Sequence, residues 1–64
     1  MAHALHADLS SIVDTIEGLR QRIAALSEPL TSGDDEELAV VLHEAERSLL
    51  MARRHLDRAT RLSR

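Results

Sequence analysis

Large apolar residues recur along the first half of the chain in alternating steps of four and three. They are Leu5, Leu9, Ile12, Ile16, Leu19, Ile23, Leu26 and Leu30. This spacing is the heptad pattern of a helix that packs against another helix, whereas a strand would need apolar residues at every second position. The pattern therefore predicts a helix over about residues 3–28 with one narrow apolar face.

The helical pattern is interrupted at Pro29, which disfavours helical geometry at the residue before it and has no backbone N–H. A turn-rich stretch with Gly33 follows, and we expect a loop over about residues 29–34. Four consecutive acids from Asp34 come next, and acids at a helix start complement its partial positive charge. A second helix is therefore expected over about residues 35–62, within a single domain spanning 1–64.

The second half of the chain repeats the four-three pattern with smaller side chains. The positions are Leu38, Leu42, Ala45, Leu49, Ala52, Leu56, Ala59 and Ser63. If the two helices fold back antiparallel, one alignment sets large residues opposite small ones. The three such layers are Ile23 with Ala45, Ile16 with Ala52, and Leu9 with Ala59. We expect an all-α, antiparallel two-helix hairpin of coiled-coil type, with Arg20 facing Glu46 at its edge.

Several apolar or small residues remain outside this predicted seam, and they indicate a surface for further helices. The candidate partner or oligomer interface consists of Val13, Val41, Ser48, Leu50, Met51, His55 and Leu62. Small side chains let another helix approach closely, and the simplest source of two more helices is a second copy. We therefore expect a homodimer that forms a four-helix bundle and a protein–protein interaction module that serves as an adaptor or regulator.

The composition argues against an enzyme. The chain has 64 residues, no cysteine and no aromatic residue, so it has too little core for an enclosed substrate pocket. His3 and His6 are close enough to share an ion, but no further ligand is expected near them. His43 and His55 lie more than three helical turns apart. We expect no catalytic residue, no metal site and no cofactor.

The arginines are the main charged feature of the sequence. The formal net charge is −3, which argues against general nucleic-acid binding, yet six of the eight basic residues lie between Arg47 and Arg64. Arg54, Arg58 and Arg61 share one helical face. Three interpretations remain open: pairing with acids of the first helix, contact with an acidic protein partner, or contact with phosphates of a nucleic acid or nucleotide.

The hydropathy pattern does not suggest a membrane protein. No apolar run approaches the 18 or more residues of a membrane span, and no basic start precedes an apolar block as in a secretory signal. We therefore expect a cytoplasmic protein.

Overall fold

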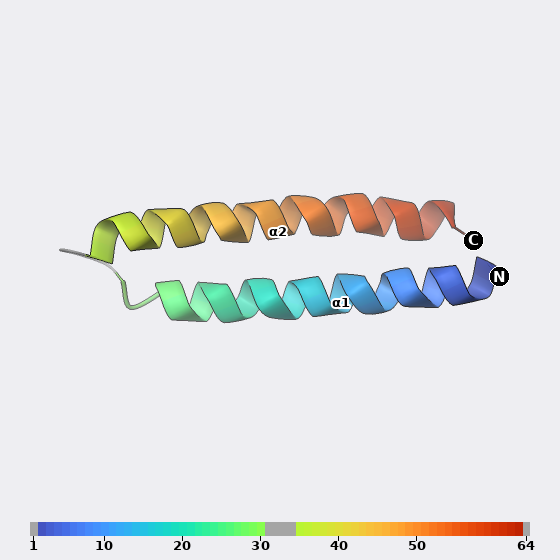
Figure 1. Ribbon diagram of the computed structural model, residues 1–64, viewed down its shortest axis with the longest axis horizontal. Coiled ribbons are helices and arrows are strands. Elements are labelled where there is room, and N and C mark those ends of the chain that lie inside the picture. Colours follow the sequence, from blue (N-terminus) through green and yellow to red (C-terminus); the bar gives the residue numbers. More distant parts are fainter. Residues whose placement is uncertain (1, 31–34, 64) are drawn as a thin grey trace.

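The computed structural model describes residues 2–30 and 35–63, with side chains from residue 4 onward. Helix α1 spans Ala2–Ser27 and helix α2 spans Glu36–Leu62. The two helices lie side by side and run in opposite directions, so the first and last turns meet at one end (Figure 1). This confirms the all-helical prediction of two helices that pack against each other, and the described ranges contain no strand.

The end of α1 follows from the chemistry of Pro29. Ser27 is the last residue of α1, and its Oγ lies within hydrogen-bond distance, 3.1 Å, of the Ala24 carbonyl oxygen one turn earlier. The Leu30 N–H then donates to the Ser27 carbonyl oxygen at 3.0 Å, which turns the chain out of the helix. The predicted bend at Gly33 falls in 31–34, outside the described residues. Acids occupy the first turn of α2, where they complement the helix dipole.

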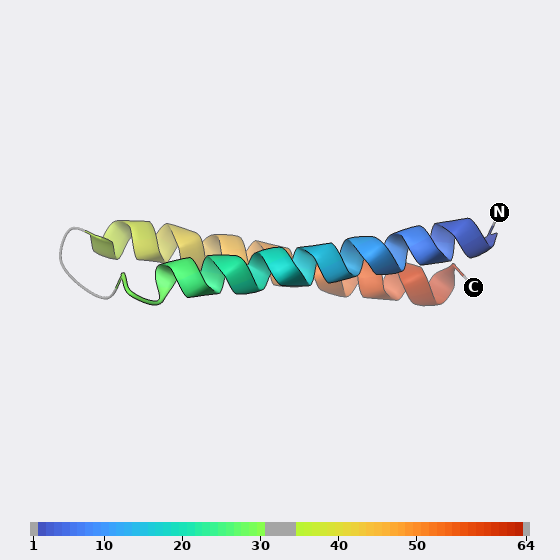
Figure 2. The same cartoon turned by 90° about the horizontal axis from the view of Figure 1, so that it is seen from below.

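The hairpin is a thin rod with almost no interior. Its extents are 51 × 14 × 11 Å, and its radius of gyration is 15.0 Å, against about 11 Å for a compact domain of this length. Turned by 90°, the two helices still run alongside each other (Figure 2). Among the described residues, only Ala39 and Ser27 are buried. Two helices alone therefore do not enclose a hydrophobic core.

The face of α1 that meets α2 differs from the predicted one. The least exposed residues form three neighbouring rows: His6, Val13, Arg20 and Ser27 in the centre, Leu9, Ile16, Ile23 and Leu30 on one side, and Ser10, Glu17 and Ala24 on the other. The prediction was wrong for the remaining apolar row. Leu5, Ile12, Leu19 and Leu26 are 53%, 46%, 42% and 66% exposed. Polar residues take their place in the seam because they find hydrogen-bond partners there, as described below.

The α2 side of the seam is closer to expectation. Leu42, Leu49 and Leu56 are all half-buried, whereas Leu38 at the start of the helix is 50% exposed. The lengthwise alignment is also close to the predicted one, since His6 instead of Leu5 lies beside Ser63. The helices therefore pair at nearly the expected height, with α1 rotated about its own axis.

Candidate interaction surfaces

One side of the hairpin is organised around the Glu17 carboxylate. Arg20 donates to it twice, from Nη2 to Oε2 at 2.6 Å and from Nε to Oε1 at 3.0 Å. Arg53 of α2 donates to Oε1 at 3.0 Å, and Gln21 donates to Oε2 at 3.1 Å. Arg53 Nε also lies 3.7 Å from Asp57 Oδ2. We call this side, marked by Glu17, Arg53 and Asp57, the polar flank.

These contacts stabilise the charged form of Glu17. The Arg20 hydrogen bonds, followed by the one from Gln21, lower the pKa of Glu17 to about 2 from the usual 4.5. In return, the same hydrogen bonds raise the pKa of Arg20. Glu17 therefore stays ionised across the ordinary pH range and acts as the electrostatic link between the two helices.

Two further polar contacts cross the seam. Ser27 Oγ lies 3.2 Å from Glu46 Oε2, so its one O–H can donate either to this carboxylate or to the Ala24 carbonyl oxygen. His6 Nδ1 lies 3.1 Å from the Thr60 carbonyl oxygen and 3.3 Å from Ser63 Oγ. Arg20 and Glu46 lie near enough across the seam for the Glu46 charge to help raise the pKa of Arg20, as the predicted pairing of opposite charges implies. Their side chains do not meet within 4.0 Å, because Arg20 is held by Glu17 on its own helix. Polar residues thus set the alignment of the helices at both ends and in the middle.

The opposite side of the hairpin carries the exposed apolar row of α1. Seven residues make two helical turns, so Leu5, Ile12, Leu19 and Leu26 project from one face. On α1 this row and Glu17 lie on opposite sides of the seam. The half-buried row of Leu9, Ile16, Ile23 and Leu30 lies next to it. The heptad spacing of the exposed row predicted burial between the two helices, and nothing in the sequence indicated that this row would form an outer surface.

A second row on α2 lies on this same side. Glu17 touches Arg53, so the polar flank of α1 meets the polar flank of α2. The side of α2 away from Asp57 carries Ala45, Ala52 and Ala59. Its outer edge carries a row of residues that are again spaced seven positions apart. That row is Val41, Ser48, His55 and Leu62, all exposed. We call the α1 and α2 rows together, Leu5, Ile12, Leu19, Leu26, Val41, Ser48, His55 and Leu62, the apolar flank.

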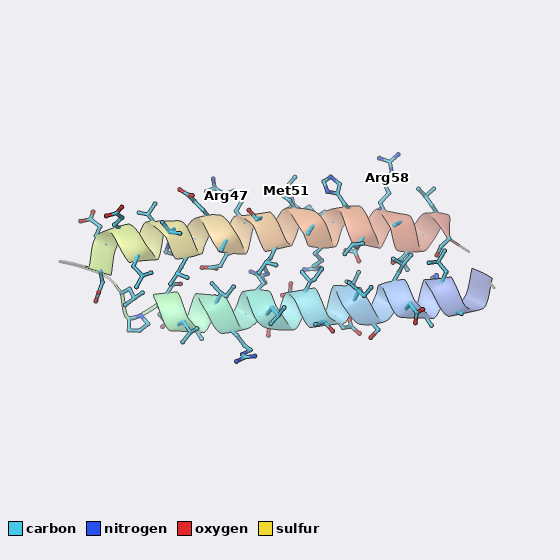
Figure 3. All side chains as sticks on the ribbon, in the orientation of Figure 1. Arg47, Met51 and Arg58 are labelled. Carbon is cyan, nitrogen blue, oxygen red and sulfur yellow. The ribbon has the colours of Figure 1, made fainter. Side chains whose placement is uncertain are left out.

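The other predicted interface residues lie elsewhere. Val13 is half-buried in the seam between the helices, and Leu50 is half-buried beside the polar flank. Met51 is 45% exposed but points away from α1, as do Arg47 and Arg58 (Figure 3). The structure therefore groups four of the seven predicted residues, Val41, Ser48, His55 and Leu62. Met51 borders this row, since it is one helical turn from Ser48 and His55, whereas Val13 and Leu50 lie away from it.

The arginines of α2 divide into two groups. Arg53 pairs with Glu17 of α1, as expected if the cluster binds acids of the first helix. Arg54, Arg58 and Arg61 are exposed, and among the described residues they have no carboxylate within 4.0 Å. They follow the outer side of α2, away from α1. Arg64 lies outside the described residues.

Pockets and clusters of metal-binding side chains are the other features that could mark a site. The described residues enclose no pocket, and they contain no group of three or more histidine or acidic side chains that could hold a metal ion. The predicted absence of a metal site at His3 and His6 concerns a residue whose side chain is not described, His3. Within the same residues, no helix is long and apolar enough to cross a membrane.

Comparisons with protein-family models, with curated proteins and with solved structures find no match to this chain. The surfaces of the hairpin are therefore interpreted from their own chemistry.

Proposed function

We propose that this chain is a non-enzymatic helical-hairpin interaction module. It self-associates through its apolar flank into a homodimeric four-helix bundle and serves as an adaptor or regulator of other proteins. The observation that carries the proposal is the exposed row of Leu5, Ile12, Leu19 and Leu26. Fully burying a large apolar side chain contributes about 1.5–3 kcal/mol, and these four, at 42–66% exposed, have roughly half of that still to gain.

The surface area of the single hairpin supports a partner of similar size. The chain exposes 5010 Å², whereas a compact monomer of its 7.1 kDa mass exposes about 4,100 Å². The excess of about 900 Å² is close to the roughly 800 Å² that each partner contributes to a stable interface. A second copy supplies the same apolar row, so one contact covers both.

Sedimentation equilibrium tests the proposal. We expect a species of twice the 7.1 kDa chain mass for the unmodified protein. The double substitution Ile12→Asp and Leu19→Asp should shift it to the single-chain mass, because two carboxylates would be buried without partners. Val40→Asp is the matched control, because Val40 is also exposed but lies three or four positions from no residue of the apolar flank, and it should leave the mass unchanged.

A single-chain mass for the unmodified protein at every concentration would contradict the proposal. So would a dimer that persists in the Ile12→Asp and Leu19→Asp variant, because the apolar flank would then play no part in association.

The arginines of α2 favour a second candidate function, a nucleic-acid-binding or nucleotide-binding regulator. Its support is the absence, among the described residues, of carboxylates near Arg54, Arg58 and Arg61. Phosphate contacts weaken steeply as salt rises. Fluorescence anisotropy with a labelled DNA duplex should then show binding at low salt that falls with added salt and is lost when all three arginines become Gln. No binding at low salt would remove this candidate.

A further inference from the structure

Two opposite charges border the exposed leucine row of α1. Asp8 follows Leu5 by three positions and Arg22 follows Leu19 by three, so both lie on the outer edge of the apolar flank, on the side away from α2. Both are exposed, and neither has an ion-pair partner among the described residues. They are 14 positions apart on one helix, about 21 Å, so they cannot pair within one chain.

We infer that two copies meet through their apolar flanks with each α1 antiparallel to the partner's α1, so that Asp8 of one copy pairs with Arg22 of the other. This inference rests on the proposed self-association and specifies its geometry. A two-fold axis at the height of Thr15 reverses the apolar row onto itself. It sets Leu5 opposite the partner's Leu26 and Ile12 opposite the partner's Leu19, and it forms the Asp8–Arg22 pair twice.

The α2 row also reverses onto itself, about a point between Met51 and Ala52. This point lies two to three positions from Arg54, which the alignment of His6 with Ser63 places level with Thr15. Reversal places Val41 opposite the partner's Leu62 and Ser48 opposite the partner's His55. Ala52 then lies at the centre of the contact between the two α2 helices. Its small side chain lets their axes approach to about 8 Å, near the lower end of the usual range.

Charge separates this arrangement from a parallel one, and side-chain polarity separates it from packing α1 on the partner's α2. Parallel α1 helices would hold Asp8 level with the partner's Asp8 and Arg22 level with the partner's Arg22, so the opposite charges could not meet. Packing α1 on the partner's α2 would also offer opposite charges, since the partner's Arg58 and Glu44 border its α2 row and would lie near Asp8 and Arg22. That packing would, however, set Ile12 and Leu19 against the partner's His55 and Ser48. The antiparallel contact of the two α1 helices instead pairs large apolar side chains with each other and Ser48 with the partner's His55.

Charge reversal with rescue tests the geometry. Asp8→Arg and Arg22→Asp should each raise the dimer dissociation constant about tenfold at low salt, because two attractive pairs become repulsive. The double variant restores opposite charges across the interface and should return the constant to within about threefold of the original. Added salt should shrink the single-variant effects. Sedimentation velocity over a dilution series provides the constants.

A single-cysteine variant gives an independent measurement, because the chain has no cysteine of its own. Thr15→Cys places two thiols beside the proposed axis, so the dimer should oxidise to a disulfide-linked pair. Asp14→Cys is the control, since Asp14 is exposed on the other side of α1 and should stay unlinked.

The outcomes separate the two levels of the proposal. A single-chain mass for the unmodified protein overturns the self-association itself. A dimer in which the double charge variant is as weak as the single ones, or in which Thr15→Cys does not link, overturns only the antiparallel geometry. Rescue together with the Thr15→Cys link supports both.

Discussion

The two flanks of this hairpin do different physical work. On the polar flank, Glu17 accepts hydrogen bonds from both helices, and its charge is balanced inside the chain. On the apolar flank, Leu5, Ile12, Leu19 and Leu26 are all more than two-fifths exposed and have nothing comparable to bury them. Directional polar contacts therefore align the helices, while the apolar surface that could stabilise them faces outward.

Magnitudes decide which flank matters more for stability. Exposed ion pairs are typically worth under about 1 kcal/mol each, because water and salt screen them. Each large apolar side chain removed from water contributes about 1.5–3 kcal/mol. Most of the available stabilisation therefore lies on the apolar flank, and it is realised only when another molecule covers that flank.

The largest expected effect on stability comes from truncating one apolar residue on the apolar flank, Leu19, and one in the seam, Ile16. If a second copy covers the apolar flank, Leu19→Ala should cost about 2 kcal/mol or more per chain, as much as Ile16→Ala in the seam. Urea denaturation at equal chain concentrations provides both values. In an uncovered hairpin, Leu19→Ala should instead behave as a surface change of about 0.5 kcal/mol.

The polar flank predicts a specific dependence on pH. The folded-state pKa of Glu17, about 2, lies below its usual 4.5. Its contribution is therefore complete above pH 4.5 and is lost as the pH falls toward 2. Thermal melts over this range should show a loss of stability that Glu17→Gln reduces, whereas Glu44→Gln, which changes an exposed acid outside the cluster, should not. Equal losses in both variants would remove Glu17 from the account.

A smaller effect is expected on a face that belongs to neither flank. Gly18 is exposed, and a Cβ built there meets nothing within 4 Å. Gly18→Ala should raise the free energy of unfolding by about 1 kcal/mol through helix propensity alone. Because folding is coupled to association, the dimer dissociation constant measured by sedimentation should fall as well. A rise in that constant would mean that a partner approaches α1 closely at Gly18.

The heptad spacing and the break at Pro29 were sufficient to predict two packed helices. They did not predict which face of α1 meets α2. Heptad spacing shows that Leu5, Ile12, Leu19 and Leu26 favour burial, but it does not say against which neighbour.

The polar part of the seam could not be predicted for a related reason. His6, Arg20 and Ser27 carry no apolar signal, and they enter the seam because partners from either helix satisfy their hydrogen bonds. Arg20 and Glu46 do interact by charge, as predicted, but the sequence did not show that Glu17, one turn away on the same helix, takes the hydrogen bonds of the guanidinium group. The row of Val41, Ser48, His55 and Leu62 was predicted as a surface, since its small and apolar residues recur at helical spacing.

The concentration dependence of thermal unfolding tests the central claim most directly. The helices lack a core of their own, so folding should be coupled to association, and the melting temperature of the unmodified chain should rise steadily with chain concentration. The Ile12→Asp and Leu19→Asp variant should show little helical signal at any concentration. A cooperative transition at one fixed temperature across a hundredfold dilution would contradict the account, because the hairpin would then be stable without anything covering its apolar flank.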